Sequence, residues 1–126
     1  MAGDDIPDAV RRLIAERIDS IPELEAVLLL REYRMREWTA ADAGVRLYVS
    51  KTVAAYMLAV LEERGFLACD GQNYRYAPAS SELEGTVDEL VHAYTQHLVA
   101  VTQLVHAKPS ASVRQFADAF RLRKGK

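Results

Sequence analysis

The segment Thr39-Ala-Ala-Asp-Ala-Gly-Val-Arg-Leu-Tyr-Val-Ser50-Lys-Thr-Val53 decides the fold of this chain. A hydroxyl residue stands ahead of a run of helix formers at Thr39 and again at Ser50, and each is a typical helix start. The pattern predicts one short helix over about 40–47 and a second from Ser50 to Arg64. Gly65 follows at once, as a glycine just past a helix end often does.

A β-hairpin is predicted directly after the second of these helices. Residues 66–69 and 74–76 have the composition of strands, and 70–73 between them is rich in turn formers. Upstream, Ser20 and Glu23 form a capping box in which Glu23 is expected to reach back to the Ser20 backbone. The helix that follows is apolar around most of its girth, which is typical of a central helix.

Two further helical regions flank this unit. At the N-terminal side, helical spacing links the apolar residues Ile6, Val10, Leu13, Ile14 and Ile18. At the C-terminal side, residues 81–108 predict one long helix with a near-heptad apolar stripe, and Pro109 ends it. A last short helix is predicted within 110–120, where Val113, Phe116, Ala117 and Phe120 share one face.

These elements predict a mainly α fold. We expect a single domain over 1–126, a winged helix-turn-helix core over 21–79 made of three helices and a β-hairpin wing, and a C-terminal helical extension over 80–126. The stripe of the long helix predicts a homodimer. The residues expected at its seam are Leu83, Val87, Leu90, Tyr94, His97, Val101 and Leu104. The alternative is a monomer that buries the whole stripe internally.

Composition excludes several classes of protein. Half of the 126 residues are hydrophobic, and the lone cysteine, Cys69, allows no internal disulfide. No apolar run is long enough to span a bilayer and the N-terminus has no secretory pattern, so a cytoplasmic location is expected. No nucleophile elbow, phosphate-binding glycine loop or metal-ligand spacing is present. We therefore expect no enzyme activity, no cofactor and no metal.

The pattern resembles bacterial winged-helix transcriptional regulators of the MarR and PadR kind. The resemblance rests on Trp38-Thr39-Ala40-Ala41, Val49-Ser50-Lys51-Thr52-Val53, Leu61-Glu62-Glu63-Arg64-Gly65-Phe66-Leu67 and Tyr74-Arg75-Tyr76. It implies a homodimer that binds operator DNA through the helix starting at Ser50 and the 66–77 wing. In such a unit the second helix of the motif can lie in the major groove.

Residue types then select the expected DNA contacts. Outward polar residues near the start of the second helix can meet base edges, and basic residues can meet phosphates. The candidates are Arg46, Ser50, Lys51, Thr52, Tyr56, Gln72, Asn73 and Arg75. Tyr48 occupies a turn position that commonly holds glycine because it tends to need a positive φ.

Charge leaves a second function open. The chain has a net charge of −2, and the charges within 38–65 cancel. A winged helix with so few cations can instead be an adaptor that binds a protein. The ends of the chain differ in sign: residues 1–30 are mostly acidic and 109–126 mostly basic, so they can attract each other within or between chains.

Overall fold

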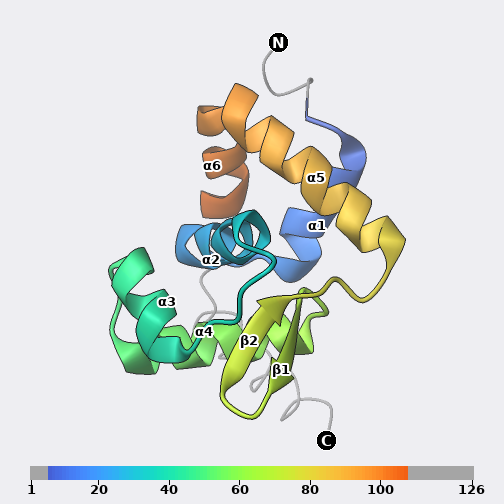
Figure 1. The fold of residues 1–126 in the computed structure, drawn as a ribbon. Helices are drawn as coiled ribbons and strands as arrows, with labels where there is room; N and C mark the ends of the chain where they lie inside the picture. The colour runs from blue at the N-terminus through green and yellow to red at the C-terminus, as the bar shows by residue number, and fades with distance from the viewer. Residues whose placement is uncertain (1–5, 108–126) are drawn as a thin grey trace, which may run out of the picture.

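Six helices and a two-stranded antiparallel sheet make up residues 6–107, the part of the chain that the computed structural model describes (Figure 1). Their order is α1 (Asp8–Arg17), α2 (Ile21–Glu32), α3 (Ala40–Leu47), α4 (Lys51–Glu63), β1 (Leu67–Asp70), β2 (Asn73–Tyr76), α5 (Ser81–Gln96) and α6 (Leu98–His106). The expected mainly helical fold with one hairpin is confirmed, and the layout is compatible with a winged helix. Over 6–107, no single helix is long and apolar enough to cross a membrane.

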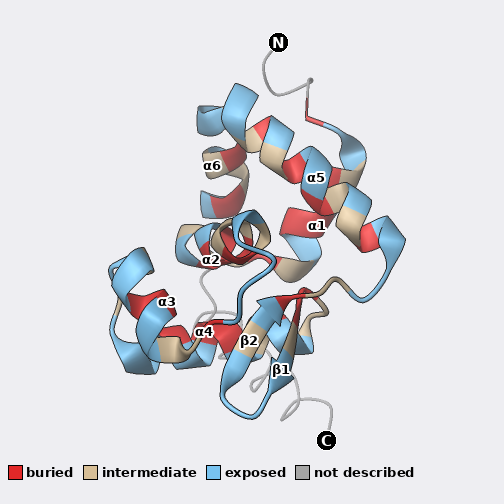
Figure 2. Cartoon of the chain, in the orientation of Figure 1, coloured by how far each residue is buried: buried red, intermediate tan, exposed pale blue. Residues whose placement is uncertain are grey.

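Helix α2 lies between two groups of elements. On one side it packs with α6, which itself contacts α1 and α5; on the other it contacts α3, α4 and β2 (Figure 1). Leu24 and Ala26 of α2 are both fully buried, although they lie on opposite sides of the helix. Figure 2 shows buried residues of both groups facing this helix. The prediction of a central helix is therefore confirmed.

Side-chain caps set the starts of four helices. In each case a serine or threonine oxygen accepts a hydrogen bond from the amide three residues on, at 3.0–3.3 Å. The capping residues are Ser20, Thr39, Ser50 and Ser80. One detail differs from the prediction, because Glu23 accepts a hydrogen bond from the amide of Asp19 at 2.9 Å and not from that of Ser20.

The turn between α3 and α4 is tight. Gly44 is required there, since a Cβ at this position would lie 2.9 Å from the carbonyl oxygen of Val49. Tyr48 adopts φ 60° and ψ 40°, so the expected positive φ is present on a residue with a side chain. This conformation costs a non-glycine residue about 1–2 kcal/mol. The Tyr48 side chain is 95% exposed and makes little packing contact that offsets this strain.

The end of α4 matches its prediction. Gly65 has φ 95°, and its amide donates to the Glu62 carbonyl at 3.1 Å while the Phe66 amide donates to the Leu61 carbonyl at 3.0 Å. This pair of bonds is the Schellman arrangement. It turns the chain directly into the hairpin, whose register pairs Leu67 with Tyr76.

The predicted long helix over 81–108 is wrong, because it is broken into α5 and α6. His97 has φ −136° and ψ 55°; its amide still bonds to Ala93, and its carbonyl accepts from the Val101 amide. The break folds α6 back onto α1 and α2, where Val101 and Val105 become buried. Burial of these side chains favours the bend over a straight helix extending into water. The short helix predicted within 110–120 lies outside the described residues.

A group of buried charges joins the α1–α2 turn to the end of α4. The Arg64 guanidinium donates to the Asp19 carboxylate at 2.8 Å, to the Glu23 carboxylate at 3.0 Å and to the Arg17 carbonyl at 2.8 Å. In return, Arg17 donates to the Arg64 carbonyl at 3.0 Å. Both carboxylates are largely buried, and the Arg64 guanidinium offsets part of the cost of burying their charge.

Replacement of Arg64 by methionine should lower the free energy of unfolding by about 2–4 kcal/mol, because it removes the guanidinium that pairs with two largely buried carboxylates and donates to the Arg17 carbonyl. The matched control is Arg31→Met, which removes the more exposed pair of Arg31 with Asp88 and should cost no more than about 1 kcal/mol. Urea unfolding of both variants measures the difference. Equal losses of unfolding free energy in the two variants would show that the Arg64 ion pairs stabilise the fold no more than an exposed ion pair does.

The strain at Tyr48 predicts a difference between two substitutions. The free energy of unfolding of Tyr48→Gly should be about 0.5–1 kcal/mol higher than that of Tyr48→Ala. Glycine removes the left-handed strain, and the greater flexibility of its unfolded chain offsets only part of this stabilisation. Both variants remove the same ring, so the comparison isolates the backbone. Thermal or urea unfolding is the measurement, and an alanine variant as stable as the glycine variant would contradict the strain.

Candidate nucleic-acid interface

The outer face of α4 is free of packing contacts along its first half. Ser50 caps the helix, Lys51 and Thr52 are exposed, and Tyr56 is 60% exposed. The first turn carries no acidic residue, so the positive end of the helix dipole is not neutralised there. The opposite face of α4 anchors the helix in the core through Ala54, Met57, Leu58 and Leu61.

The inward face of α4 differs from the predicted one. The sequence pattern favours Val53, Met57, Val60 and Leu61, but Val53 is 46% exposed and Val60 is half-buried. Ala54 and Leu58 are buried in their place. Because this helix has apolar residues at most positions, more than one stripe fits helical spacing, and packing against its neighbours selects between them.

The wing is fixed to the core through Trp38. The Trp38 and Tyr74 backbones exchange two hydrogen bonds of 2.7 Å, which adds a short antiparallel bridge to the hairpin. Trp38 is buried, with Arg36 stacked 3.8 Å from a ring centroid and Tyr33 edge-on at 6.0 Å. Trp38 is therefore a core residue, and the wing has a defined position beside α4.

A groove of about 450 Å³ lies between the start of α3, the outer face of α4 and the wing. We call it the wing groove; its lining residues are Thr39, Ala40, Ala41, Lys51, Ala55, Gly71, Gln72 and Tyr74. Two of the sequence-predicted site residues, Lys51 and Gln72, are brought together here. Lys51 is the charged residue among those that line it. Gly71, with φ 67°, lets the hairpin turn at the rim.

Other predicted contact residues are exposed but do not line the wing groove. Ser50, Thr52 and Tyr56 lie on α4 outside it, and Asn73 and Arg75 are exposed on β2. Arg46 lies apart from these residues. Its guanidinium donates to the Tyr33 hydroxyl at 3.3 Å and lies 5.0 Å from the centroid of that ring.

No sequence pattern indicated that three alanines line one part of the wing groove. Ala40, Ala41 and Ala55 line it without filling it because they carry no long side chain, and the half-buried Tyr74, which pairs with Trp38, also lines it. Thr39 was predicted as the cap of the helix over 40–47, and it also lines the wing groove. Nothing in the periodicity of α3 indicates a groove.

Two tyrosines of the wing have altered acidity. Burial raises the pKa of Tyr74, with a smaller contribution from its hydrogen bond with Cys69. Burial also raises the pKa of Tyr76 to about 12, against the opposing effect of Arg31. The Tyr76 hydroxyl has no hydrogen-bond partner among residues 6–107. Both hydroxyls are therefore neutral at ordinary pH, and neither supplies charge to the wing.

The predicted dimer seam is mostly inside the monomer. Leu83, Val87, Leu90 and Val101 are buried in the intramolecular core, so in this fold they are not accessible to a second chain. Tyr94, His97 and Leu104 are half-buried. The first half of the stripe is buried because α5 packs on α1, and the break at His97 brings Val101, in the second half, onto α1 and α2. For Leu83, Val87, Leu90 and Val101, the structure agrees with the alternative in which the monomer buries the stripe internally.

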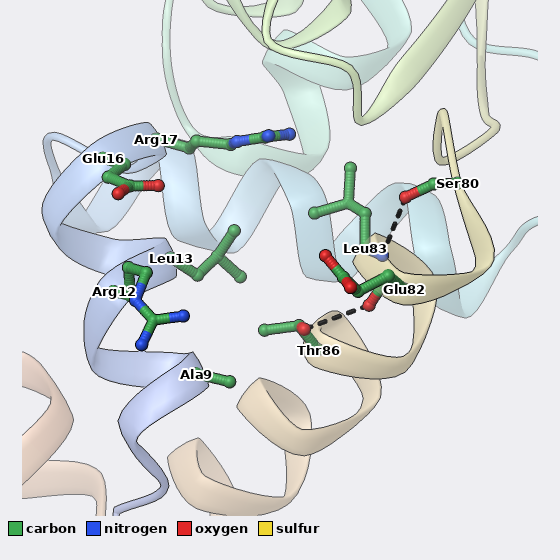
Figure 3. Close-up of a pocket in the computed structure, with 9 residues that line it drawn as sticks. All are labelled: Ala9, Arg12, Leu13, Glu16, Arg17, Ser80, Glu82, Leu83 and Thr86. Carbon is green, nitrogen blue, oxygen red and sulfur yellow. Dashed lines mark hydrogen bonds between the residues drawn. The ribbon is translucent and has the colours of Figure 1, made fainter.

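A second cavity, of about 330 Å³, separates α1 from the start of α5 (Figure 3). Arg12 and Glu82 extend toward it from opposite sides, while Ser80 is occupied in capping Leu83 and the Thr86 hydroxyl bonds to the Glu82 carbonyl. The charges around it are of both signs. This arrangement selects no ligand class.

The described residues contain no group of three or more His, Cys, Asp or Glu side chains placed to hold a metal ion. Comparisons of the chain with protein-family models, with curated proteins and with solved structures gave no match. The functional argument therefore rests on the geometry of the chain itself.

The raised pKa of Tyr76 predicts a stability change in alkali. The folded-state pKa of about 12 exceeds the ordinary value of 10.0, so the stability that this group contributes is complete below pH 10 and is lost as the pH rises toward 12. Tyr76→Phe should lose less free energy of unfolding over that interval and should be no less stable at pH 7, because no hydrogen bond is removed. An identical alkaline profile for both proteins would refute this.

Proposed function

We propose that the protein is a DNA-binding transcriptional regulator that reads duplex DNA with α4 and the wing. The observation that carries the proposal is the acid-free first half of α4, anchored on one side and exposed on the other, with the wing groove beside it. An exposed helix of this kind matches the major groove in width. The wing tip then lies at the side of the helix, where an adjacent backbone or groove would pass.

Each exposed residue has a role in this arrangement. Thr52 and Tyr56 face outward on α4 and can contact base edges, while Ser50 is committed by its side chain to the Val53 amide. Lys51 and Arg75 provide positive charge for phosphates from α4 and from β2. Gln72 at the wing tip has an amide that can donate to a phosphate or to a base.

The small number of cations sets the strength of binding. Glu62 and Glu63 are exposed at the far end of α4, and Asp70 is exposed on the wing, so they reduce the local positive charge. Few phosphate contacts per chain give a shallow salt dependence and weak non-specific affinity. A homodimer would double these contacts, and under this proposal two chains bind one duplex.

A second function, a winged-helix adaptor that binds a protein, is favoured by one specific observation. Large apolar side chains are exposed on α3, α4 and the turn between them, at Val45, Tyr48, Val53 and Tyr56. Exposed aromatic and aliphatic residues of this kind are typical of protein interfaces. The two functions differ in what they predict for a change of charge at Lys51.

Lys51→Glu should weaken binding to duplex DNA about tenfold or more and should lower the slope of log affinity against log salt by about 1. The matched control is Arg12→Glu, which changes the net charge equally on α1, where Arg12 is exposed and lies away from α4 (Figure 3). Fluorescence anisotropy with DNA from upstream of the protein's own gene, over a salt series, is the measurement.

Equal weakening by Lys51→Glu and Arg12→Glu would show that binding follows net charge and that α4 is not the reader. Binding of neither the wild-type protein nor the control to duplex DNA at low salt would reject the regulator and favour the adaptor. In that case, an unchanged complex with a protein partner on Lys51→Glu and a weakened one on Tyr56→Ser would be the adaptor's signature.

A further inference from the structure

A narrow row of exposed side chains runs along the outward side of α4. We call it the outer row; its members are Thr52, Ala55, Tyr56 and Ala59. They recur at three- and four-residue steps, so they fall within about 100° of arc around the helix axis. The opposite side of α4 holds its buried anchors, among them Leu58 and Leu61. The outer row is therefore the part of α4 that a duplex would meet first.

Most of the outer row is apolar. Ala55 and Ala59 end in methyl groups, and Thr52 carries a methyl group beside its hydroxyl. Thr52 and Tyr56 have a single hydroxyl each, so neither can form the two parallel hydrogen bonds that arginine makes to guanine or asparagine makes to adenine. The sequence of α4 contains no arginine, asparagine or glutamine. Direct reading of guanine or adenine by paired hydrogen bonds therefore finds no suitable side chain in the outer row.

Lys51 is the basic residue of α4, and it lies on the flank of the outer row. Its side chain leaves the helix about 100° around the axis from that of Thr52, and it lines the wing groove together with Thr39 and Gln72. A cation at the side of a reading helix is placed for a phosphate more than for a base edge. The base contacts of α4 are therefore left to the outer row.

Thymine is the base whose edge suits this surface. In the major groove it presents a C5-methyl group, which the other three bases lack, and the methyl groups of alanine and threonine pack against it. Burial of one such group raises affinity about fourfold. A cytosine in the same place would bring an amino group against side-chain methyls, where it would lose water without gaining a hydrogen-bond partner.

The length of the outer row sets the number of bases that it can cover. Thr52 and Ala59 are seven residues apart, which is about 10.5 Å along the helix axis. Successive bases along one strand are about 3.4 Å apart, so a helix that follows the groove covers about three steps. The short side chains of Ala55 and Ala59 let the backbone of α4 approach the base edges closely.

We infer that α4 recognises thymine methyl groups in the major groove, and that the DNA site carries at least two thymines among the base pairs that the outer row covers. Thr52, Ala55 and Ala59 are then the residues that determine specificity. This inference rests on the proposed DNA-binding function and deepens it, because it names the base edge that the helix selects. It assigns the exposed methyl groups of α4 to DNA, where the adaptor function would assign them to a protein.

The first test compares two duplexes that differ only in their thymine methyl groups. Both have the sequence upstream of the protein's own gene, and in the second every thymine is replaced by uracil, which keeps the Watson–Crick pairing and lacks the C5-methyl. Fluorescence anisotropy gives the affinity for each duplex. Loss of two or more buried methyl contacts predicts that thymine DNA binds about tenfold or more tightly than uracil DNA.

The outcomes separate this inference from the function on which it rests. Equal affinities for the two duplexes, with both bound, would overturn the reading of methyl groups and leave DNA binding by α4 and the wing in place. No binding of either duplex at low salt would reject the DNA-binding function and this inference with it.

Substitutions at Thr52 then locate the source of the preference for thymine over uracil. Thr52→Ser removes the side-chain methyl and keeps the hydroxyl, and it should lower the preference about fourfold. Thr52→Val keeps a methyl at that place and removes the hydroxyl, and it should retain the preference whatever its effect on overall affinity. The matched control is Thr95→Ser, the same change on the exposed surface of α5, which should leave the preference unchanged.

Ala59→Ser extends the test along the outer row. It replaces an exposed methyl by a hydroxymethyl group outside the core, and it should also lower the preference for thymine. A preference that survives both Thr52→Ser and Ala59→Ser would show that DNA shape, and not contact with α4, distinguishes the two duplexes. That result would overturn the assignment to the outer row.

Discussion

The burial of α2 on opposite sides is the constraint on which the rest of the structure depends. Leu24 and Ala26 are both inaccessible to solvent, one turned away from the other. A helix in this environment must be covered by two separate groups of elements, and hydrophobic burial holds both in place. One group is α3 and α4 with the hairpin; the other is α1 with α5 and α6. The bend at His97 follows from this constraint, because it brings α6 onto α2.

The candidate site depends on the close packing of α3, α4 and the hairpin. Gly44 allows the turn between α3 and α4 to pass close to α3, because a Cβ at this position would clash with the Val49 carbonyl oxygen. The Trp38–Tyr74 bridge fixes the hairpin beside α4. Arg64 then ties the end of α4 to the α1–α2 turn through Asp19 and Glu23. With α4 held at both ends, its outer face is presented as a rigid surface, as precise recognition requires.

Local chemistry made much of the fold predictable from sequence. The caps at Thr39 and Ser50 and the end of α4 at Gly65 each follow from the properties of a few neighbouring residues, and each is present in the structure. The break at His97 could not be foreseen, because neither glycine nor proline marks it and tertiary packing causes it. A heptad-like stripe does not reveal whether its partner is the same chain or another.

The candidate site was predictable only in part. Lys51 and Gln72 were each expected as DNA contacts from their residue types, and they line one groove. Arg46 was also a candidate DNA contact, but its guanidinium lies over the Tyr33 ring and donates to the Tyr33 hydroxyl. The rotation of α4 was also missed: in a helix with so many apolar residues, neighbours and not periodicity decide which face turns inward.

The most direct measurement of the central claim is an NMR titration of the full chain with a short DNA duplex, followed through its backbone amides. Reading by α4 and the wing predicts that the largest shifts fall on residues 50–56 and 71–75, with little change in α1 and α5. Shifts spread evenly over exposed basic residues, or confined to the α1–α5 side, would contradict the account.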